Sequence, residues 1–235
     1  TLLRHADMAM YRAKQNGRGS YACYSEDLDR RTHEDMLLHA RLKTALSERL
    51  LTLHFQPQIR LDDGRLVGAE ALLRWNDPVL GTIAPDRFIP LAEKTGLILP
   101  LADWVLETAC RQIAAWQAAG TPIRLAVNIS AHQLQHGLAE KIHALLASTG
   151  ARAHWLELEI TESAAMDHPA AAHKQLSALV ALGCSVSLDD FGTGHSGLGH
   201  LHKLAFDSVK LDQSFVRALP GDAKGAALVR GIASQ

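Results

Sequence analysis

The chain has 235 residues, of which 47% are hydrophobic and 21% charged, and its formal net charge at pH 7 is −1. This length and composition allow one large domain, or one domain plus a fragment, to bury a substantial core. The balanced charge predicts no binding to a nucleic-acid polymer or to an anionic membrane surface. Aromatic residues make up only 5% of the chain, too few to predict stacking platforms for single strands.

The cysteine content indicates a reducing compartment. The chain has three cysteines, Cys23, Cys110 and Cys184, an odd count without C-x-x-C spacing. We therefore expect free thiols and a cytoplasmic location. The sequence shows no signal peptide and no run of about 18 apolar residues, so we expect no membrane contact from this segment. Both ends fall inside predicted helices, so we expect a longer parent protein, in which any membrane anchor lies upstream.

The first part of the chain predicts helices, strands and one linker. In chain order they are a helix over 1–17, a strand over 21–24, a charged linker over 25–31, a helix over 34–49, and strands over 51–61 and 65–75. The two longer strands flank Asp62-Asp63-Gly64, which is typical of a hairpin turn.

The rest of the chain alternates between helices and strands. We predict helices over 100–119, 138–149 and 170–182, and strands over 124–129, 155–160, 185–188 and 208–211. Repeated βα units with apolar strands predict a parallel sheet, either open or closed as a barrel.

Polar side chains stand near the ends of five successive predicted strands. They are Glu70, Asn128, Glu159, Asp189 and Lys210, with Asp190 directly after Asp189. Active-site groups of a βα barrel come from the C-terminal ends of several strands, so we expect one shared site. Carboxylate and amide oxygens together suit Mg²⁺ or Mn²⁺ rather than Zn²⁺.

Each of these residues also has an ordinary structural interpretation when taken alone. A single Glu at a strand end is commonly a solvated or paired edge group, Asn128 could cap a helix, and Lys210 could face solvent. Asp189 and Asp190 could cap the helix that follows them. The coincidence over five strands favours the shared site.

The segment after Asp190 also matches a second motif. Gly192, Gly194 and Gly197 have the G-x-G-x-x-G spacing of a dinucleotide-binding turn, with Asp212 about 20 residues further on. Two carboxylates directly before the glycines would repel a pyrophosphate, and the motif comes late in the chain. The metal site is therefore favoured over a nicotinamide-dependent oxidoreductase, which stays as an alternative.

An ordered set of motifs runs from about residue 37 to residue 235. One is Glu70-Ala71-Leu72, followed by Leu73-Arg74-Trp75. The others are Phe55-Gln56-Pro57, Arg87-Phe88-Ile89-Pro90-Leu91-Ala92-Glu93, Asn128-Ile129-Ser130, Glu159-Ile160-Thr161-Glu162, Asp189-Asp190-Phe191-Gly192-Thr193-Gly194 and Val209-Lys210-Leu211-Asp212. This set resembles the EAL-domain phosphodiesterases of bacterial cyclic di-GMP signalling, in which Glu70-Ala71-Leu72 matches the motif that names the family.

The resemblance implies an α/β fold, a modified TIM (β/α)₈ barrel whose first strand is antiparallel to the others. It also implies two divalent ions per site. The residues that match the ligands of the first ion are Glu70, Asn128, Glu159 and Asp189, and Asp189 also shares a second ion with Asp190. Lys210 matches the lysine that helps to hold and polarise the attacking water. The catalytic set is thus Lys210, Glu70, Asp189 and Asp190.

Three further residues match family positions outside the metal ligands. Gln56 and Arg74 match residues that contact the substrate, and Glu162 matches the glutamate that anchors the loop after Asp190. The implied reaction is the opening of cyclic di-GMP to linear pGpG with Mg²⁺ or Mn²⁺, whereas Ca²⁺ is expected to bind unproductively. Homodimerisation is implied by family likeness alone.

The beginning of the chain resembles a different family. Residues 6–14 with Gly17-Arg18 are similar to the C-terminal helix and turn of a GGDEF (diguanylate cyclase) domain, whose own signature motif is absent. We therefore predict a GGDEF remnant over 1–22, a linker over 23–36 and an EAL domain over 37–235.

The chain departs from the family pattern in the loop and at its end. His195 replaces an aromatic residue and Gly197 replaces a serine, which should change loop dynamics. Family members continue through two more strands that supply another metal-site glutamate and a substrate-contacting glutamine. We therefore expect an incomplete barrel here, which is unstable or self-associating and hydrolyses substrate poorly. The alternatives are an inactive cyclic di-GMP receptor and a structural module that binds a partner.

Overall fold

The computed structural model describes residues 26–48, 50–192 and 206–218, together with positions 6, 9, 10, 13 and 21. Outside the described residues lie Cys23, His195 and Gly197, and most of the predicted remnant over 1–22. No helix within the described ranges is both long enough and apolar enough to cross a bilayer.

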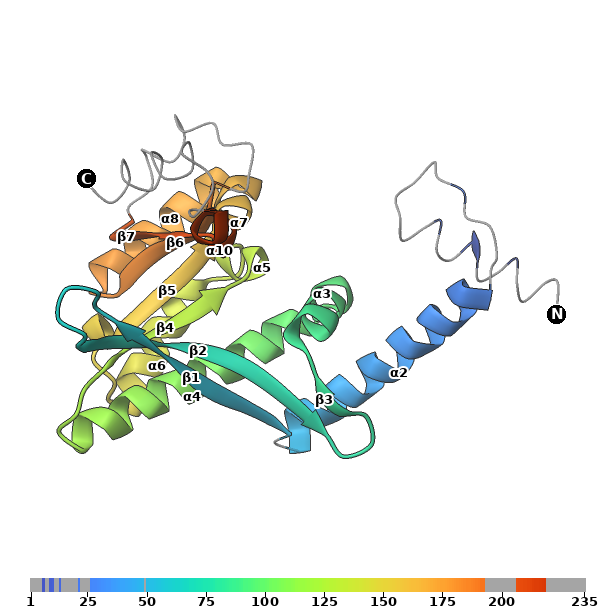
Figure 1. Cartoon of the computed structure of the whole chain (residues 1–235), viewed down its shortest axis with the longest axis horizontal. Coiled ribbons are helices and arrows are strands. Elements are labelled where there is room, and N and C mark those ends of the chain that lie inside the picture. The colour runs from blue at the N-terminus through green and yellow to red at the C-terminus, as the bar shows by residue number, and fades with distance from the viewer. Residues whose placement is uncertain are drawn as a thin grey trace. The chain divides into compact units, whose positions relative to one another are not determined.

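The described strands form one mixed sheet. They are β1 (Leu51–Ile59), β2 (Leu66–Asp77), β3 (Gly81–Ile83), β4 (Arg124–Ile129), β5 (Leu156–Thr161), β6 (Ser185–Phe191) and β7 (Ser208–Leu211). The order across the sheet is β1-β2-β4-β5-β6-β7, with the short β3 paired to β2. The pairs from β2 through β4, β5, β6 and β7 are all parallel. Figure 1 shows β4 to β7 side by side.

Helices connect these strands, as expected for repeated βα units. They are α2 (Glu26–Glu48), α3 (Pro85–Thr95), α4 (Ile98–Ala118), α5 (Ala131–Leu134), α6 (Leu138–Thr149), α7 (Glu162–Asp167), α8 (Pro169–Ala181) and α10 (Gln213–Ala218), with a 3₁₀ turn η1 (Ala153–Trp155). Four of these helices were not predicted from the sequence: α3, α5, α7 and α10. Three of these have at most six residues, so they carry little periodic signal.

The first strand runs against the second, as the modified barrel predicts. At the turn, the Arg60 N–H donates to the Arg65 carbonyl at 2.9 Å, and at the far end the Asn76 N–H donates to the Leu50 carbonyl at 3.3 Å. Between the strands, Gly64 has φ 70°, a left-handed conformation that glycine adopts without steric cost. The predicted hairpin is confirmed, and the described sheet is of the α/β class expected for a modified TIM barrel.

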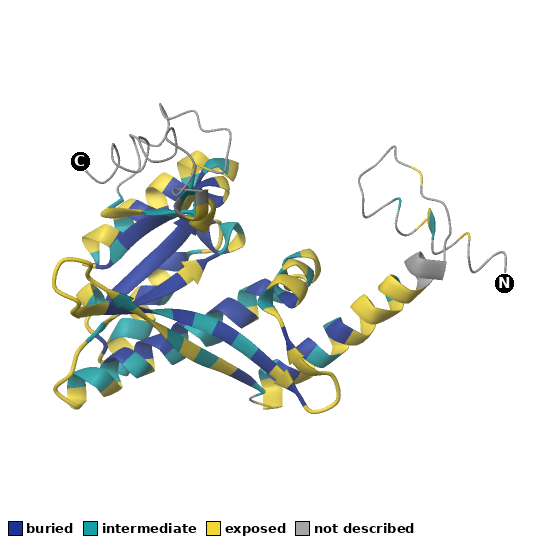
Figure 2. Ribbon diagram, in the orientation of Figure 1, coloured by how far each residue is buried: buried dark blue, intermediate teal, exposed yellow. Residues whose placement is uncertain are grey.

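The chain divides into two compact units, of which the larger contains residues 51–74 and 98–235. Its core lies between one face of the sheet and the helices α4, α6 and α8. Side chains at less than 5% exposure fill it, among them Leu125, Val127, Leu156, Leu158, Ile160, Leu106, Ile113, Ile142, Leu176 and Leu179. Each such side chain contributes roughly 1.5–3 kcal/mol by leaving water. Figure 2 shows this buried band along β4 and β5.

Two cysteines belong to this core. Cys110 on α4 and Cys184 just before β6 are buried free thiols. Burial raises the pKa of Cys110 to about 12, with a further contribution from Cys184, and burial raises the pKa of Cys184 to about 11. Both thiols are therefore protonated and unreactive in the folded protein.

We expect neither core thiol to react readily with a thiol reagent. In a Cys23→Ser variant at pH 8, labelling by dithionitrobenzoate should be about a hundredfold slower for folded than for urea-unfolded protein. Rapid release of chromophore from the folded protein would contradict this burial.

The smaller unit contains residues 1–50 and 75–97. The Trp75 ring packs edge-on against Phe88 of α3, with the ring centroids 5.4 Å apart, and both side chains are fully buried. Arg41 of α2 forms an ion pair with Asp77 at the end of β2, with Nε and Oδ2 2.6 Å apart. This pair fixes α2 to the end of β2.

The predicted linker over 25–31 is wrong where the structure describes it. Helix α2 begins at Glu26, eight residues before the predicted start at 34. The charged residues of this segment include Glu and Arg, which, like Leu, are good helix formers. The segment therefore forms part of a helix and not a linker. The assignment of residues 1–22 to a separate domain stays a prediction.

Candidate functional site

Strand β5 shows how the sequence directs its carboxylates to one face. Successive side chains on a strand point to opposite faces, so Leu156, Leu158 and Ile160 pack into the core while Glu157 and Glu159 face the other way. Glu159 is only 1% exposed. A buried carboxylate needs a charged or hydrogen-bonding partner, so this face of the sheet must supply one.

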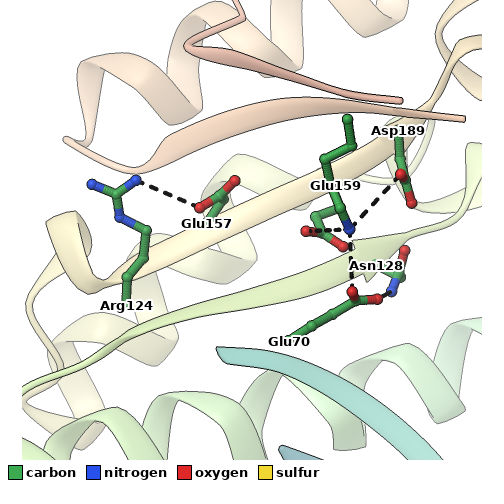
Figure 3. Close-up of polar contacts among 7 residues, drawn as sticks. Glu70, Arg124, Asn128, Glu157, Glu159 and Asp189 are labelled. Carbon is green, nitrogen blue, oxygen red and sulfur yellow. Dashed lines mark hydrogen bonds and ion pairs between the residues drawn. The ribbon is translucent and has the colours of Figure 1, made fainter. Parts of the chain in front are cut away.

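The partner is an ammonium group two strands further along the chain, on β7. Lys210 Nζ of β7 lies 2.8 Å from Glu159 Oε1, 3.1 Å from Glu70 Oε2 and 3.7 Å from Asp189 Oδ1. Asn128 Nδ2 donates to Glu70 Oε1 at 2.9 Å. Figure 3 shows Glu70, Asn128, Glu159 and Asp189 gathered at one end of the strands. All five predicted strand-end residues are thus brought together, each from a different strand.

A β-bulge lets two consecutive carboxylates lie beside the same lysine. Leu188 pairs with Val209 and Phe191 pairs with Leu211, so two residues of β6 lie opposite the single Lys210 of β7. The extra residue accompanies a φ of 55° at Asp190, the one non-glycine residue with positive φ in the described ranges. Such a conformation costs free energy and occurs preferentially at functional sites.

The charges in this cluster shift one another's pKa values. Burial raises the pKa of Glu159, and the neighbouring charges of Glu70 and Asp189 raise it further, against the opposing effect of Lys210. Burial lowers the pKa of Lys210, but its contacts with Glu159, Glu70 and Asp189 outweigh burial and raise it. Burial and the charges of Asp189 and Asp212 also raise the pKa of Asp190. The cluster thus has four carboxylates around one ammonium, and the raised pKa values of Glu159 and Asp190 reflect burial together with the repulsion among these carboxylates.

This cluster of carboxylates fits a divalent cation. Glu159 Oε2 is buried and accepts no hydrogen bond from the described residues. An all-oxygen set of carboxylates with one amide suits Mg²⁺ or Mn²⁺, and rotating the Asn128 amide would present its oxygen to the cluster. In the described ranges no group of three or more His, Cys, Asp and Glu side chains is already arranged as a metal site. Lys210 Nζ lies among the carboxylates instead.

The two predicted substrate-contacting residues lie outside this cluster. Gln56 of β1 is exposed, and Arg74 of β2 donates from its guanidinium to the Leu73 carbonyl at 2.9 Å. In the described part of the chain neither residue has a hydrogen bond or ion pair to the cluster. Alternation along β2 nevertheless places Arg74 on the same face as Glu70, and Gln56 lies on the face opposite Phe55, which packs on the core.

Glu162, predicted to anchor the loop after Asp190, contacts the start of that loop at Gly192. The Gly192 N–H donates to Glu162 Oε2 at 3.4 Å, and Glu162 is 4% exposed at the start of α7. Gly192 has φ 94°, and a Cβ there would lie 2.8 Å from the Phe215 ring of α10. Only glycine fits this turn. The motif that resembles a dinucleotide fingerprint therefore begins with a glycine required for packing.

One contact near the site could not be predicted from the sequence motifs. Asp207, directly before β7, exchanges two hydrogen bonds with Val186 of β6. Its N–H donates to the Val186 carbonyl and its Oδ2 accepts from the Val186 N–H, both at 2.8 Å. An Asp before a short apolar strand is common at turns, so the sequence offered only a weak signal.

Comparisons with known proteins identify the family of this chain. The EAL domain family model matches residues 39–235. The bifunctional diguanylate cyclase/cyclic di-GMP phosphodiesterase MucR of Pseudomonas aeruginosa is 41% identical over 233 residues, 98% of this chain and 34% of MucR. The cyclic di-GMP phosphodiesterase PdeR of Escherichia coli is 38% identical over 232 residues, 98% of this chain and 35% of PdeR.

A solved structure shares the fold as well as the sequence. The PaMucR phosphodiesterase in complex with c-di-GMP superimposes with a TM-score of 0.79 at 42% identity, covering 84% of this chain and 81% of that one. The chain spans about a third of the length of MucR and PdeR. With a family match over most of the sequence and the same fold in a solved relative, the chain belongs to the EAL domain family.

Proposed function

We propose that this domain is a cyclic di-GMP phosphodiesterase that opens its substrate to linear pGpG. The observation that carries the proposal is the cluster around Lys210, in which Glu70, Glu159 and Asp189 lie within 3.7 Å of one ammonium. Two of the similar proteins carry this activity in their names, and a related structure is a c-di-GMP complex.

Phosphodiesterases with an EAL domain generally depend on a divalent metal. We propose Mg²⁺ or Mn²⁺, two per site, because the donors are oxygen atoms. Glu70, Asn128, Glu159 and Asp189 would hold one ion, and Asp189 with Asp190 the other. When bound, the ions lower the pKa of the attacking water and offset charge on the phosphate.

The remaining steps fall to residues of the chain itself. Lys210 holds the water and supplies positive charge beside the phosphate, while Gln56 and Arg74 orient the dinucleotide. Water adds to one phosphorus, one P–O ester bond breaks, and the leaving ribose oxygen takes up a proton. Glu162 keeps the loop after Asp190 in place through Gly192.

Two further expectations belong to this proposal. Homodimerisation rests on family likeness, and the buried free thiols of Cys110 and Cys184 support a reducing, cytoplasmic setting. An inactive receptor for cyclic di-GMP is less well supported, because every metal-ligand position that residues 1–235 cover has a matching residue, and these residues adjoin one cluster. A structural module would have no use for the buried Glu159 carboxylate, whose burial costs several kcal/mol unless it is paired.

The test is hydrolysis by protein that contains the whole EAL domain. Purified protein is incubated with cyclic di-GMP and Mg²⁺, Mn²⁺ or Ca²⁺, and the products are separated by chromatography. We expect pGpG with Mg²⁺ and Mn²⁺ and none with Ca²⁺ or chelator. Tight binding of cyclic di-GMP without product under any metal would show a receptor instead. Whether residues 1–235 hydrolyse substrate on their own stays a prediction, tested in the same assay.

A further inference from the structure

We infer that Asp207 is a positioning residue for Lys210, acting by locking β7 onto β6 in a single register. The inference rests on the proposed function and concerns how its lysine is held. The observations are two hydrogen bonds, one strand pairing and the contacts of Lys210.

Strand β7 depends on β6 for its position. It has four residues, Ser208–Leu211, and its sheet partner in the described part of the chain is β6. Ser208 pairs with Ser187 and Val209 with Leu188, after which the bulge interrupts the register. A strand this short, with an irregular end, is held by few ladder hydrogen bonds. Another contact is needed to prevent slippage.

The correct register is essential because side chains alternate along a strand. Lys210 faces the carboxylates, while its neighbours Val209 and Leu211 point to the other face. A slip by one residue would move every side chain of β7 to the opposite face. An apolar side chain would then lie among Glu70, Glu159 and Asp189, and these carboxylates would lose their ammonium.

Asp207 provides a contact that fits only one register. Its backbone N–H donates to the Val186 carbonyl and its carboxylate accepts from the Val186 N–H, both at 2.8 Å. Val186 is fully buried, so without this acceptor a buried N–H would lose its partner. Asp207 itself is exposed, which indicates that its carboxylate is present for this bond and not for core packing.

The test compares three variants in protein containing the whole domain. Asp207→Ala removes the acceptor, whereas Asp207→Asn keeps an amide oxygen that can accept from Val186. Asp63→Ala is the matched control, since Asp63 Oδ1 also accepts a backbone N–H, from Arg65 at 3.1 Å, but in the hairpin turn. Steady-state hydrolysis of cyclic di-GMP with Mn²⁺ gives kcat and KM separately.

We expect Asp207→Ala to lower kcat by about tenfold to a hundredfold, because a displacement of the order of 1 Å has such an effect. KM should stay within about twofold, since the proposed substrate contacts on β1 and β2 are untouched. Asp207→Asn should recover kcat to within about threefold of the unchanged protein, and Asp63→Ala should stay within about twofold. Unchanged kcat in Asp207→Ala overturns the inference. An equal loss of kcat in Asp207→Ala and Asp207→Asn, together with a raised KM, also overturns the inference.

A second readout does not depend on activity. The rate at which Lys210 is acylated by an N-hydroxysuccinimide ester at fixed pH, followed by mass spectrometry, reports whether its amine stays among the carboxylates. It should rise about fivefold or more in Asp207→Ala and not in Asp63→Ala or Asp207→Asn. If no protein hydrolyses cyclic di-GMP, the proposed function fails, while this labelling still decides the role of Asp207.

Discussion

Replacing Glu159 with glutamine is expected to lower the rate of cyclic di-GMP hydrolysis by about a thousandfold or more, since a metal ligand supplies several kcal/mol and 1.36 kcal/mol is tenfold. Glutamine has nearly the same shape but no charge. It would remove the closest anionic partner of Lys210, at 2.8 Å, and one of the carboxylates proposed to hold a divalent ion. Initial rates with Mn²⁺, measured by chromatography of pGpG, give the result.

The matched control lies two residues away on the same strand and the same face. Glu157 is also buried, but it pairs with Arg124 at 3.6 Å toward the other end of the strands, as Figure 3 shows. Glu157→Gln should keep the rate within about threefold, because this pair does not touch the proposed reacting groups. Equal rates for Glu159→Gln and Glu157→Gln would remove Glu159 from the catalytic machinery.

Replacing Asp77 with alanine is expected to lower the free energy of unfolding by about 2–4 kcal/mol, because two backbone N–H groups and the partly buried Arg41 guanidinium would lose their acceptor. The Asp77 side chain is fully buried. Its Oδ2 contacts Arg41 Nε at 2.6 Å, and its Oδ1 accepts from the N–H groups of Val79 and Leu80 at 2.8 and 2.9 Å. Alanine would leave these donors without an acceptor. Urea unfolding followed by circular dichroism measures the change.

Two control variants separate the contributions of Asp77. Asp77→Asn keeps an oxygen for the two backbone N–H groups and loses only the charge opposite Arg41. Its free energy of unfolding should therefore lie between that of the unchanged protein and that of Asp77→Ala. Asp86→Ala removes an exposed carboxylate from the first turn of α3 and should cost less than about 1 kcal/mol. If Asp77→Ala lowers the free energy of unfolding no more than Asp86→Ala does, the ion pair is not stabilising.

The same pair predicts a pH dependence of stability. Burial would raise the pKa of Asp77, but hydrogen bonds from Arg41, Leu80 and Val79 and the charge of Arg41 outweigh burial and lower it below 3.8. Its folded pKa is thus below the unfolded value, so its stabilisation is complete above the unfolded pKa and is lost as pH falls through the folded pKa. The difference in unfolding free energy between the unchanged protein and Asp77→Asn should therefore shrink as the pH falls below about 5.

Local patterns in the sequence were enough to predict the elements that carry the site. Alternation along residues 155–160 and the hairpin signal at Asp62-Asp63-Gly64 depend only on neighbouring residues, and both were confirmed within one or two residues. The charged start of α2 was misassigned because charge density does not distinguish a linker from an exposed helix. The ordered motifs identified the family, since so many spaced matches do not coincide by chance.

The contacts within the cluster could not be predicted from local patterns. Glu70 and Lys210 are 140 residues apart in the chain, and only the strand order and the register of the sheet bring them to 3.1 Å. The bulge beside Asp190 and the Asp207 contact with Val186 depend likewise on how β6 and β7 meet. The sequence alone determined which side chains share a face of the sheet, because successive side chains on a strand alternate between its two faces. Tertiary structure decided which of them touch, because register and bulges are set by pairing between distant strands.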